Sequence, residues 1–282
     1  MKLIFREFSF DLSGKTPVMG ILNVTPDSFT DGGLFFTKET AVERGLQMVE
    51  DGADIMDVGG ESTRPGSTSV EFDEELRRTI SVIEVLAKRI NIPISIDTYK
   101  AGIAKRALDA GASMVNDISG LRFDPAMARV VAEYNVPVVI MHIKGTPKNM
   151  QINPEYEALI PEIIDYLRVS MGIAMEAGIR ENNIIIDPGI GFGKTFEHNL
   201  EILNNLREFT LLGKPLLIGP SRKAFIGRIL NTASPLERLE GTSAAVAIAI
   251  INGANIVRIH DVREMVKVAR VADAIKRETI EA

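Results

Sequence analysis

Eight short apolar runs separated by amphipathic stretches constrain the fold of this chain more than any other feature of its sequence. The runs are residues 18–24, 54–59, 93–97, 113–117, 136–142, 183–187, 215–221 and 255–260. They are continuously apolar, which is typical of parallel strands buried on both faces of a sheet. The intervening stretches, such as 74–89, 98–110 and 161–177, have the length and periodicity of crossover helices. The alternation therefore predicts an α/β fold with a parallel sheet.

A weak internal repeat supports a closed form of this fold. Each copy has a glycine that ends a helix and then a strand with a polar residue at the sixth position; the copies are residues 52–58, 111–117 and 253–259. The polar residues are Asp57, Asn116 and Arg258. Eight strand–helix units form a (β/α)8 TIM barrel of about 250 residues, and the length of 282 residues suits it. An open doubly wound sheet is the alternative, because the same alternation builds both folds.

Composition limits the domain count and the classes of partner. We expect a single domain over residues 1–282, since no Pro/Ser-rich linker divides the chain. The net charge is −6 without a block of lysines or arginines, so neither nucleic acid nor an anionic membrane is an expected partner. The absence of cysteine excludes disulfides and thiolate chemistry. Arg6, Glu7 and Asp11 interrupt the region where a signal peptide would be apolar, so we expect a soluble cytoplasmic protein.

The segment IIIDPGIGFGKT (184–195) has the Gly-Lys-Thr ending of a nucleotide-binding P-loop. A Walker A loop requires a glycine five places before the Gly-Lys pair, and Pro188 occupies that place. Proline has a fixed φ and no N–H, so it removes a phosphate donor where the loop must curl. The glycine spacing also differs from the dinucleotide fingerprint. The segment is therefore not predicted to bind a nucleotide. Lys194 is instead predicted to form a surface ion pair, the ordinary role of a single lysine.

Nearly every predicted strand ends in, or just before, a side chain that forms hydrogen bonds. These residues are Asn23, Asp57, Asp97, Asn116, His142, Asp187, Ser221, Lys223, Arg258 and His260. In a barrel the active site lies at the carboxyl ends of the strands, and its residues come from several strands. A single Asp or Asn at such a position is more often a helix cap or a turn residue. That explanation does not cover so many residues together, so we expect a site at this end.

The residue types at this end indicate two kinds of ligand group. Carboxylates and an amide from neighbouring strands suit a planar heterocycle with amino, amide and ring N–H groups. They are Asp97, Asn116 and Asp187. Cationic side chains and a histidine suit an anionic leaving group or a phosphate. They are Arg64, Lys223, Arg258 and His260.

Two predicted loops are longer than connections between a strand and a helix usually are. They cover residues 25–38, which include Phe29, and residues 60–70. Glycines in both loops can act as hinges, so the loops can close over a substrate and exclude water. Surface loops without such a role are the alternative.

Motifs spread along the chain occur together in one known family. They are GILNVTPDSFTDGG (20–33), DVGGESTRPG (57–66), IDT (96–98), VND (115–117), DPGIGFGK (187–194), GPSRK (219–223) and RIHDV (258–262). In this order they resemble the dihydropteroate synthases, and the resemblance covers residues 20–262. NVTPDSF, GGESTRPG and SRK are the specific motifs, whereas VND alone carries no information.

The resemblance implies a transferase of folate biosynthesis that condenses hydroxymethyl-dihydropterin pyrophosphate with para-aminobenzoate, with Mg²⁺ as cofactor. It implies that the pterin is bound by Asp97, Asn116, Asp187 and Lys223. It implies that the pyrophosphate is bound by Asn23 with the metal, Thr63, Arg64, Arg258 and His260. It implies that the aminobenzoate lies near Thr63, Pro65, Phe192, Ser221 and Phe29. The implied catalytic residues are Asp97, Lys223 and Arg64.

Two other functions compete with this interpretation. A pterin-binding methyltransferase that acts on a corrinoid protein needs the Asp/Asn/Asp set but no pyrophosphate residues, and GGESTRPG, SRK and RIH argue against it. A paralogue that only binds pterins should lack Asp97, Lys223 or an anion-binding residue, and all are present. The resemblance also implies inhibition by sulfonamides and a homodimer, for which the predicted helix at 242–254 offers an apolar face. Packing of that helix on the barrel explains the same face.

Overall fold

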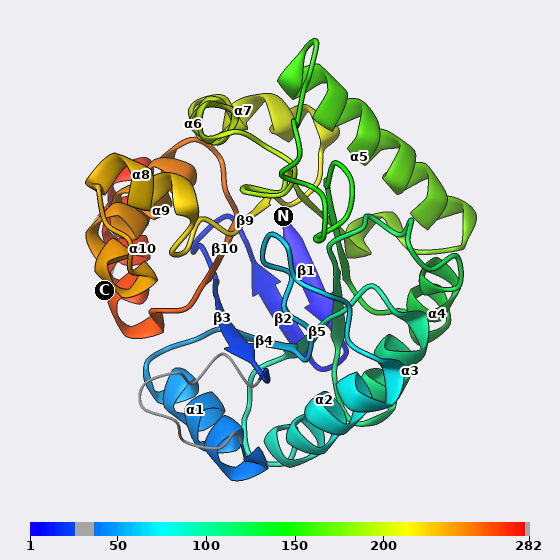
Figure 1. Cartoon of the computed structure of the whole chain (residues 1–282). Coiled ribbons are helices and arrows are strands. Elements are labelled where there is room, and N and C mark those ends of the chain that lie inside the picture. Colours follow the sequence, from blue (N-terminus) through cyan, green and yellow to red (C-terminus); the bar gives the residue numbers. More distant parts are fainter. Residues whose placement is uncertain (26–36, 280–282) are drawn as a thin grey trace.

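A computed structural model describes residues 1–25 and 37–279, and Figure 1 shows a ring of strands surrounded by helices. The strands of the ring are β3 (Val18–Asn23), β4 (Ile55–Gly59), β5 (Ile94–Asp97), β6 (Met114–Asp117), β7 (Val138–Met141), β8 (Ile184–Asp187), β9 (Leu217–Ile218) and β10 (Ile256–Ile259). The helices are α1 (Lys38–Glu50), α2 (Phe72–Leu86), α3 (Ala101–Asp109), α4 (Met127–Tyr134), α5 (Leu159–Glu176), α6 (Phe196–Asn204), α7 (Leu206–Phe209), α8 (Ala224–Leu230), α9 (Leu239–Ile251) and α10 (Val262–Arg277). Each of the predicted apolar runs contains one strand of the ring. None of the helices in these two ranges is long and apolar enough to cross a membrane.

The ring is a closed parallel sheet. Its strands are ordered β8-β7-β6-β5-β4-β3-β10-β9, and each neighbouring pair is parallel. The first and last strands of that order meet at a parallel bridge between Ile186 and Leu216, where the Ile186 N–H donates to the Pro215 carbonyl at 2.9 Å. The predicted (β/α)8 TIM barrel is therefore confirmed, and the doubly wound sheet, which has two open edges, is excluded.

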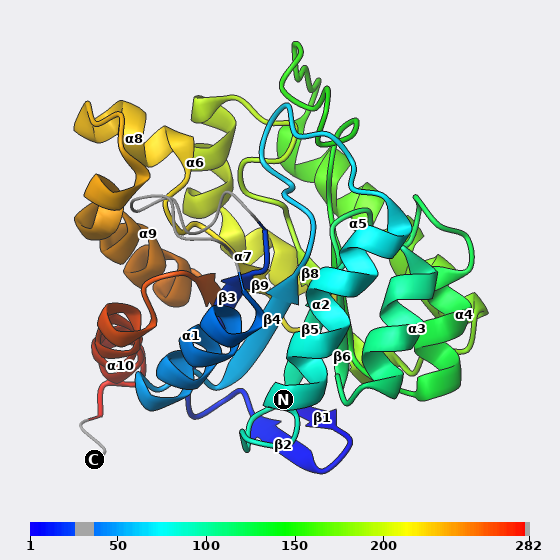
Figure 2. The ribbon, with the colours of Figure 1, turned by 60° about the horizontal axis from the view of Figure 1, so that its bottom comes forward.

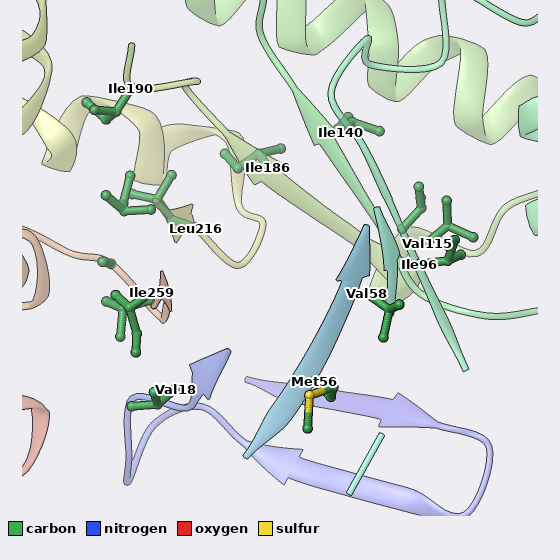
Figure 3. Packing of buried hydrophobic residues seen from close by; sticks show 14 of the residues in the cluster. Val18, Met56, Val58, Ile96, Val115, Ile140, Ile186, Ile190, Leu216 and Ile259 are labelled. Carbon is green, nitrogen blue, oxygen red and sulfur yellow. The ribbon is translucent and has the colours of Figure 1, made fainter. Parts of the chain in front are cut away.

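One set of strand side chains points outward and packs against the helices. Figure 3 shows Val58, Ile96, Val115, Ile140 and Ile186 from successive strands in this outer core, and each is fully buried. Both faces of every strand are thus covered, which explains why the runs are continuously apolar.

The other set points into the barrel, and its character changes along the strands. The lower layer is apolar and consists of Met19, Ile55, Met114, Val139, Ile185, Leu217 and Ile256. Side chains of a strand alternate between its faces, so a residue two positions later points the same way. Two positions after Ile55, Met114, Ile185 and Ile256 lie Asp57, Asn116, Asp187 and Arg258. The barrel therefore has an apolar floor and a polar layer above it.

An N-terminal hairpin, absent from the sequence prediction, closes the floor. Its strands β1 (Lys2–Phe5) and β2 (Phe8–Asp11) pair antiparallel, and Figure 2 shows them beneath the barrel. Leu3 and Leu12 are buried in the same apolar cluster as the lower layer. Strands of four residues leave too short an alternation to be recognised in a sequence.

The glycines of the internal repeat have the predicted role. Gly52, Gly111 and Gly253 follow α1, α3 and α9 with φ values of 98°, 116° and 117°. A positive φ is open to glycine at little cost, so these residues end each helix and direct the chain into the next strand.

Candidate active site

A buried carboxylate, Asp57, organises the polar layer. Its Oδ2 accepts hydrogen bonds from Asn116 Nδ2 at 3.0 Å and from Arg258 Nε at 2.6 Å. The other side of the guanidinium donates to Asp97 Oδ2 at 2.5 Å. The polar residues of the three repeat copies therefore meet inside the barrel, and one arginine bridges the carboxylates of β4 and β5.

The charge of Asp97 is finely balanced in this layer. Burial raises the pKa of Asp97 to about 7, and the nearby carboxylates of Asp57, Glu75 and Asp117 act in the same direction, whereas Arg258 opposes them. Loss of hydration on burial is the largest of these effects, so the pKa stays raised although Arg258 lies beside the carboxylate. The Asp97 side chain therefore changes its charge near neutral pH.

The cap or turn explanation applies to some strand ends and not to others. Asp117 accepts hydrogen bonds from the backbone N–H groups of Ser119 at 2.8 Å and Leu121 at 3.0 Å, so it shapes the loop after β6. Helix α3 begins after Lys100, three residues beyond Asp97. The Asp97 carboxylate is therefore not a helix cap, and its partner is an arginine from the other side of the barrel.

A carboxyl, an amine and an aromatic ring gather where β8 ends. Asp187 Oδ1 accepts the N–H of Gly189 at 2.7 Å, and burial raises the pKa of Asp187 to about 6. Lys223 immediately precedes α8, and its Nζ lies 4.2 Å from the centroid of the Phe192 ring. Burial lowers the pKa of Lys223 to about 8, and the charge of Arg258 acts in the same direction. Lys223 therefore titrates close to neutral pH.

Ser221 and His260 join the loop after β9 to the end of β10. Ser221 Oγ lies 2.9 Å from His260 Nδ1 and accepts the His260 backbone N–H at 3.1 Å. Arg222 has a left-handed φ of 57° and forms an ion pair with Asp261, which fixes this turn. Burial lowers the pKa of His260 to about 3, and the positive charges of Arg222 and Arg64 contribute. The imidazole is therefore neutral at physiological pH.

An ionic network holds the base of the loop at 60–70. Lys100 Nζ forms ion pairs with Glu61 at 2.8 Å and Glu75 at 2.6 Å, and also donates to the Val70 carbonyl. Glu61 in turn accepts the Val70 N–H at 2.9 Å and the Tyr99 hydroxyl at 2.7 Å. Both ends of the loop are thus fixed beside β5. The loop carries half-buried Thr63 and exposed Arg64 and Pro65.

Two predicted site residues are associated with the first long loop. Asn23, the predicted metal ligand, precedes it, and Phe29, the predicted closing aromatic, belongs to its sequence. Asn23 ends β3 and is half-buried at the same end of the barrel. Phe29 lies outside the described residues. Across residues 1–25 and 37–279, no group of three or more His, Cys, Asp or Glu side chains is arranged to hold a metal ion.

The prediction for Lys194 is wrong, because its side chain is only 2% exposed. Its Nζ lies 2.8 Å from His142 Nδ1 and donates to the Phe192 carbonyl at 2.9 Å. A lysine after a glycine-rich loop has the sequence signature of a surface residue, and only the folded loop shows that it turns inward. The sequence placed Asp57 among the strand-end residues of the site but assigned it no ligand, and its pairing with Asn116 and Arg258 was not predicted.

Comparisons with known proteins agree with this arrangement. The model of the family described as pterin binding enzyme matches residues 19–260. The chain is 50% identical to the dihydropteroate synthase of Synechocystis sp. over 268 residues, which are 95% of this chain and 93% of that protein.

Solved structures give the same result. The Yersinia pestis dihydropteroate synthase in a sulfonamide drug complex has a TM-score of 0.94 and 41% identity, over 98% of this chain and 100% of that chain. The Xanthomonas albilineans dihydropteroate synthase in complex with 7,8-dihydropteroate has a TM-score of 0.88 and 38% identity, over 98% and 99% of the two chains. This chain therefore belongs to the pterin-binding enzymes and, among them, to the dihydropteroate synthases.

Proposed function

We propose that this dihydropteroate synthase condenses hydroxymethyl-dihydropterin pyrophosphate with para-aminobenzoate by a dissociative route, in which pyrophosphate leaves before the amine attacks. The observation that carries the proposal is the polar layer, where carboxyl, amide and cationic groups gather above an apolar floor. The Xanthomonas albilineans relative was solved with 7,8-dihydropteroate, the product of this condensation.

The pterin would be bound by groups that face the inside of the barrel. Their hydrogen-bonding capacity suits the amino, amide and ring nitrogen groups of a planar heterocycle. They are Asp97, Asn116, Asp187 and Lys223. As the bond to pyrophosphate breaks, positive charge develops on the methylene and the ring. An ionised Asp97 stabilises that charge, because burial keeps water from screening the interaction.

The pyrophosphate would meet donors at the rim of the barrel: Asn23, Thr63, Arg64, Arg258 and His260. His260 is neutral, and its Nδ1 faces Ser221 Oγ. In the proposed arrangement the Ser221 hydroxyl, which accepts a backbone N–H, donates its own proton to Nδ1, and the ring proton lies on Nε2. His260 then donates to a phosphate oxygen as a neutral group. Arg258 supplies positive charge once the pterin engages Asp97.

Magnesium fits the residues present as an ion shared between substrate and protein. Mg²⁺ takes oxygen ligands and is often bound by one or two protein groups together with substrate phosphates and water. The amide oxygen of Asn23 suits that role, and a protein-only site is not found in the part of the chain that the structure describes. When bound, the ion would neutralise charge on the leaving pyrophosphate.

The aminobenzoate would occupy the space beside the loops at the barrel mouth. The residues proposed to contact it are Thr63, Pro65, Phe192, Ser221 and Phe29. Its aromatic amine is weakly basic and attacks a cation directly, so no strong general base is required. Sulfonamides are proposed to compete at this place, which is supported by the sulfonamide complex of the Yersinia pestis relative. The cytoplasmic location predicted from the sequence remains part of the proposal.

Pyrophosphate release tests the proposal. We expect release from the pterin pyrophosphate with Mg²⁺ to depend on aminobenzoate, and to fall at least ~100-fold in Lys223→Ala because a cation beside the reacting pterin is lost. Lys105→Ala is the control, since Lys105 is exposed on α3 and pairs with Asp109 away from the barrel interior. Tight pterin binding without release in the wild type would instead identify a binding paralogue or a methyl-transfer enzyme.

We further propose that the chain forms a homodimer through α9 and α10. From Ala244 to Ile251 helix α9 is apolar on all its faces, and it packs on α10. Exposed apolar side chains remain on the two helices: Ile248 is 50%, Val271 61% and Ile275 65% exposed. In a homodimer this face would be covered by the same face of a second copy of the chain.

Light scattering measures this directly. We expect a molar mass of twice 30.9 kDa for the wild type and the mass of one chain for Val271→Glu with Ile275→Glu. Leu211→Glu, at a position 79% exposed after α7, should leave the dimer intact. A single-chain mass for the wild type at high micromolar concentration would refute the proposal.

A further inference from the structure

The side chain of Lys194 is buried without a counterion. It is among the largest fully buried side chains of the described residues, and its contacts are a histidine ring nitrogen and a backbone carbonyl. Among the described residues, no carboxylate lies within ion-pair distance of Nζ. Burial lowers the pKa of Lys194 well below its ordinary value. A lysine retained under these conditions requires an explanation other than a surface ion pair.

The chemistry of the two partners defines what Lys194 does. A carbonyl oxygen can only accept, so one Nζ–H bond is directed to the Phe192 carbonyl at 2.9 Å. Burial lowers the pKa of His142 to about 2, so the imidazole is neutral. Nζ therefore links the loop after β8 to His142, which directly follows β7, through a ring nitrogen 2.8 Å away.

The loop after β8 packs tightly against the residues that follow β7. A Cβ on Gly189 would lie 2.0 Å from the His142 carbonyl oxygen, and one on Gly193 would lie 2.6 Å from that of Lys144. The Tyr156 hydroxyl donates to the Gly193 carbonyl at 2.6 Å. The loop thus touches its neighbour through backbone atoms at both ends, and Lys194 fixes the carbonyl between them.

The residue whose carbonyl is fixed in this way is Phe192. Its ring is 8% exposed and lies 4.2 Å from Lys223 Nζ. Its N–H donates to the Gly189 carbonyl at 3.1 Å. With both backbone groups engaged, the direction of the side chain is set by the loop.

We propose that Lys194, supported by His142, is a positioning residue that acts through Phe192 on the binding of the second substrate. This inference rests on the proposed function in one respect, the contact between Phe192 and para-aminobenzoate. Lys194 touches no reacting atom in this scheme. Its loss changes where the aromatic ring lies, and it leaves the pterin groups on β5 and β6 in place.

Lys194→Met tests the inference, because methionine fills the space of the lysine chain without a donor. We expect KM for aminobenzoate to rise about 10-fold or more, the effect of leaving a buried acceptor unpaired. Kd for the pterin pyrophosphate should change several-fold less than KM, because Asp187 and Lys223 border this loop but Asp97 and Asn116 do not. Lys105→Met is the control: Lys105 is exposed on α3 and contacts Asp109 and Tyr134, not the loop after β8. It should change neither constant.

A double-mutant cycle with Phe192→Leu shows whether the effect passes through the ring. If it does, adding Lys194→Met to Phe192→Leu changes KM little, whereas independent effects would multiply. Multiplying effects, or equal losses in KM and in pterin Kd, would overturn the inference. Lys194→Gln retains one donor and should give an intermediate KM, so it replaces Lys194→Met if that variant fails to fold.

Hydrogen exchange separates this inference from the proposed function, because it needs no substrate. The Phe192 and Gly191 amides are bonded to the Gly189 carbonyl and to Asn199 Oδ1. We expect their exchange to be at least about 10-fold faster in Lys194→Met than in wild type or Lys105→Met. Unchanged exchange would refute the positioning role even if the wild type is an active synthase. Faster exchange with an inactive wild type would refute the proposed function alone.

Discussion

Replacing Asp97 by asparagine is expected to slow pyrophosphate release about 10³-fold while pterin affinity changes only a few-fold. Asparagine keeps the shape and one acceptor oxygen, so the hydrogen bonds to the bound pterin survive. It removes the negative charge that stabilises the developing cation, and that charge matters most when the bond to pyrophosphate breaks. Single-turnover release and calorimetric binding of a non-reactive pterin measure the two quantities separately.

The pH dependence provides the internal control for this variant. Protonation below about pH 7 removes the Asp97 charge in the free enzyme, so kcat/KM for the pterin substrate should rise with pH through that region. Above about pH 8 Lys223 loses its proton, and kcat/KM should fall. In Asp97→Asn the rising limb should move down to about pH 6, where the remaining carboxyl of Asp187 titrates. Equal losses of rate and pterin affinity, with the rising limb still near pH 7, would mean that Asp97 only binds the pterin.

Lys100→Met is expected to lower the free energy of unfolding by about 3–5 kcal/mol, the usual cost of breaking a buried ion pair from one side. Its two partners are almost fully buried: the side chains of Glu61 and Glu75 are 7% and 1% exposed. Methionine leaves both carboxylates without a cation. KM for the pterin pyrophosphate should rise as well, since Arg64 lies on the loop whose ends this network holds. Urea unfolding followed by circular dichroism gives the free energy.

Two comparisons sharpen that measurement. Lys105→Met removes an exposed lysine from α3, where water screens the pair with Asp109, so the free energy of unfolding should hardly change. Adding Glu61→Gln and Glu75→Gln to Lys100→Met should recover much of the lost stability, because no buried charge is then left unpaired. A loss below about 1 kcal/mol for Lys100→Met alone would show that water reaches the carboxylates.

The parts of this structure that follow a simple period were predictable from the sequence. The eight strands are apolar on both faces, and the polar residues that face inward come two positions after the floor residues, as Ile55 and Asp57 illustrate. The glycine ends of the helices, such as Gly52, follow from the φ that they require. Periodicity and backbone preference are local properties, so a sequence carries them directly.

The parts that depend on contacts across the barrel were not predictable. The guanidinium of Arg258 reaches two carboxylates that lie 201 and 161 residues away in sequence. Whether Lys194 faces solvent or the interior is decided by how a glycine-rich loop curls, and several conformations are open to such a loop. The hairpin that covers the floor consists of short strands. Their apolar residues can be recognised as core residues only once they pack beside Leu217 and Ile256.

The closed floor also determines where ligands enter and leave the barrel. With Leu3 and Leu12 sealing one end, substrates and product share the remaining opening and pass through it in turn. In the proposed arrangement the pterin lies deeper than the aminobenzoate, so it has to arrive first. Bound dihydropteroate then prevents the next molecule of the pterin substrate from entering. With a single opening, we expect product release to limit turnover, and an analogue that spans both substrate positions and dissociates slowly should inhibit the enzyme most strongly.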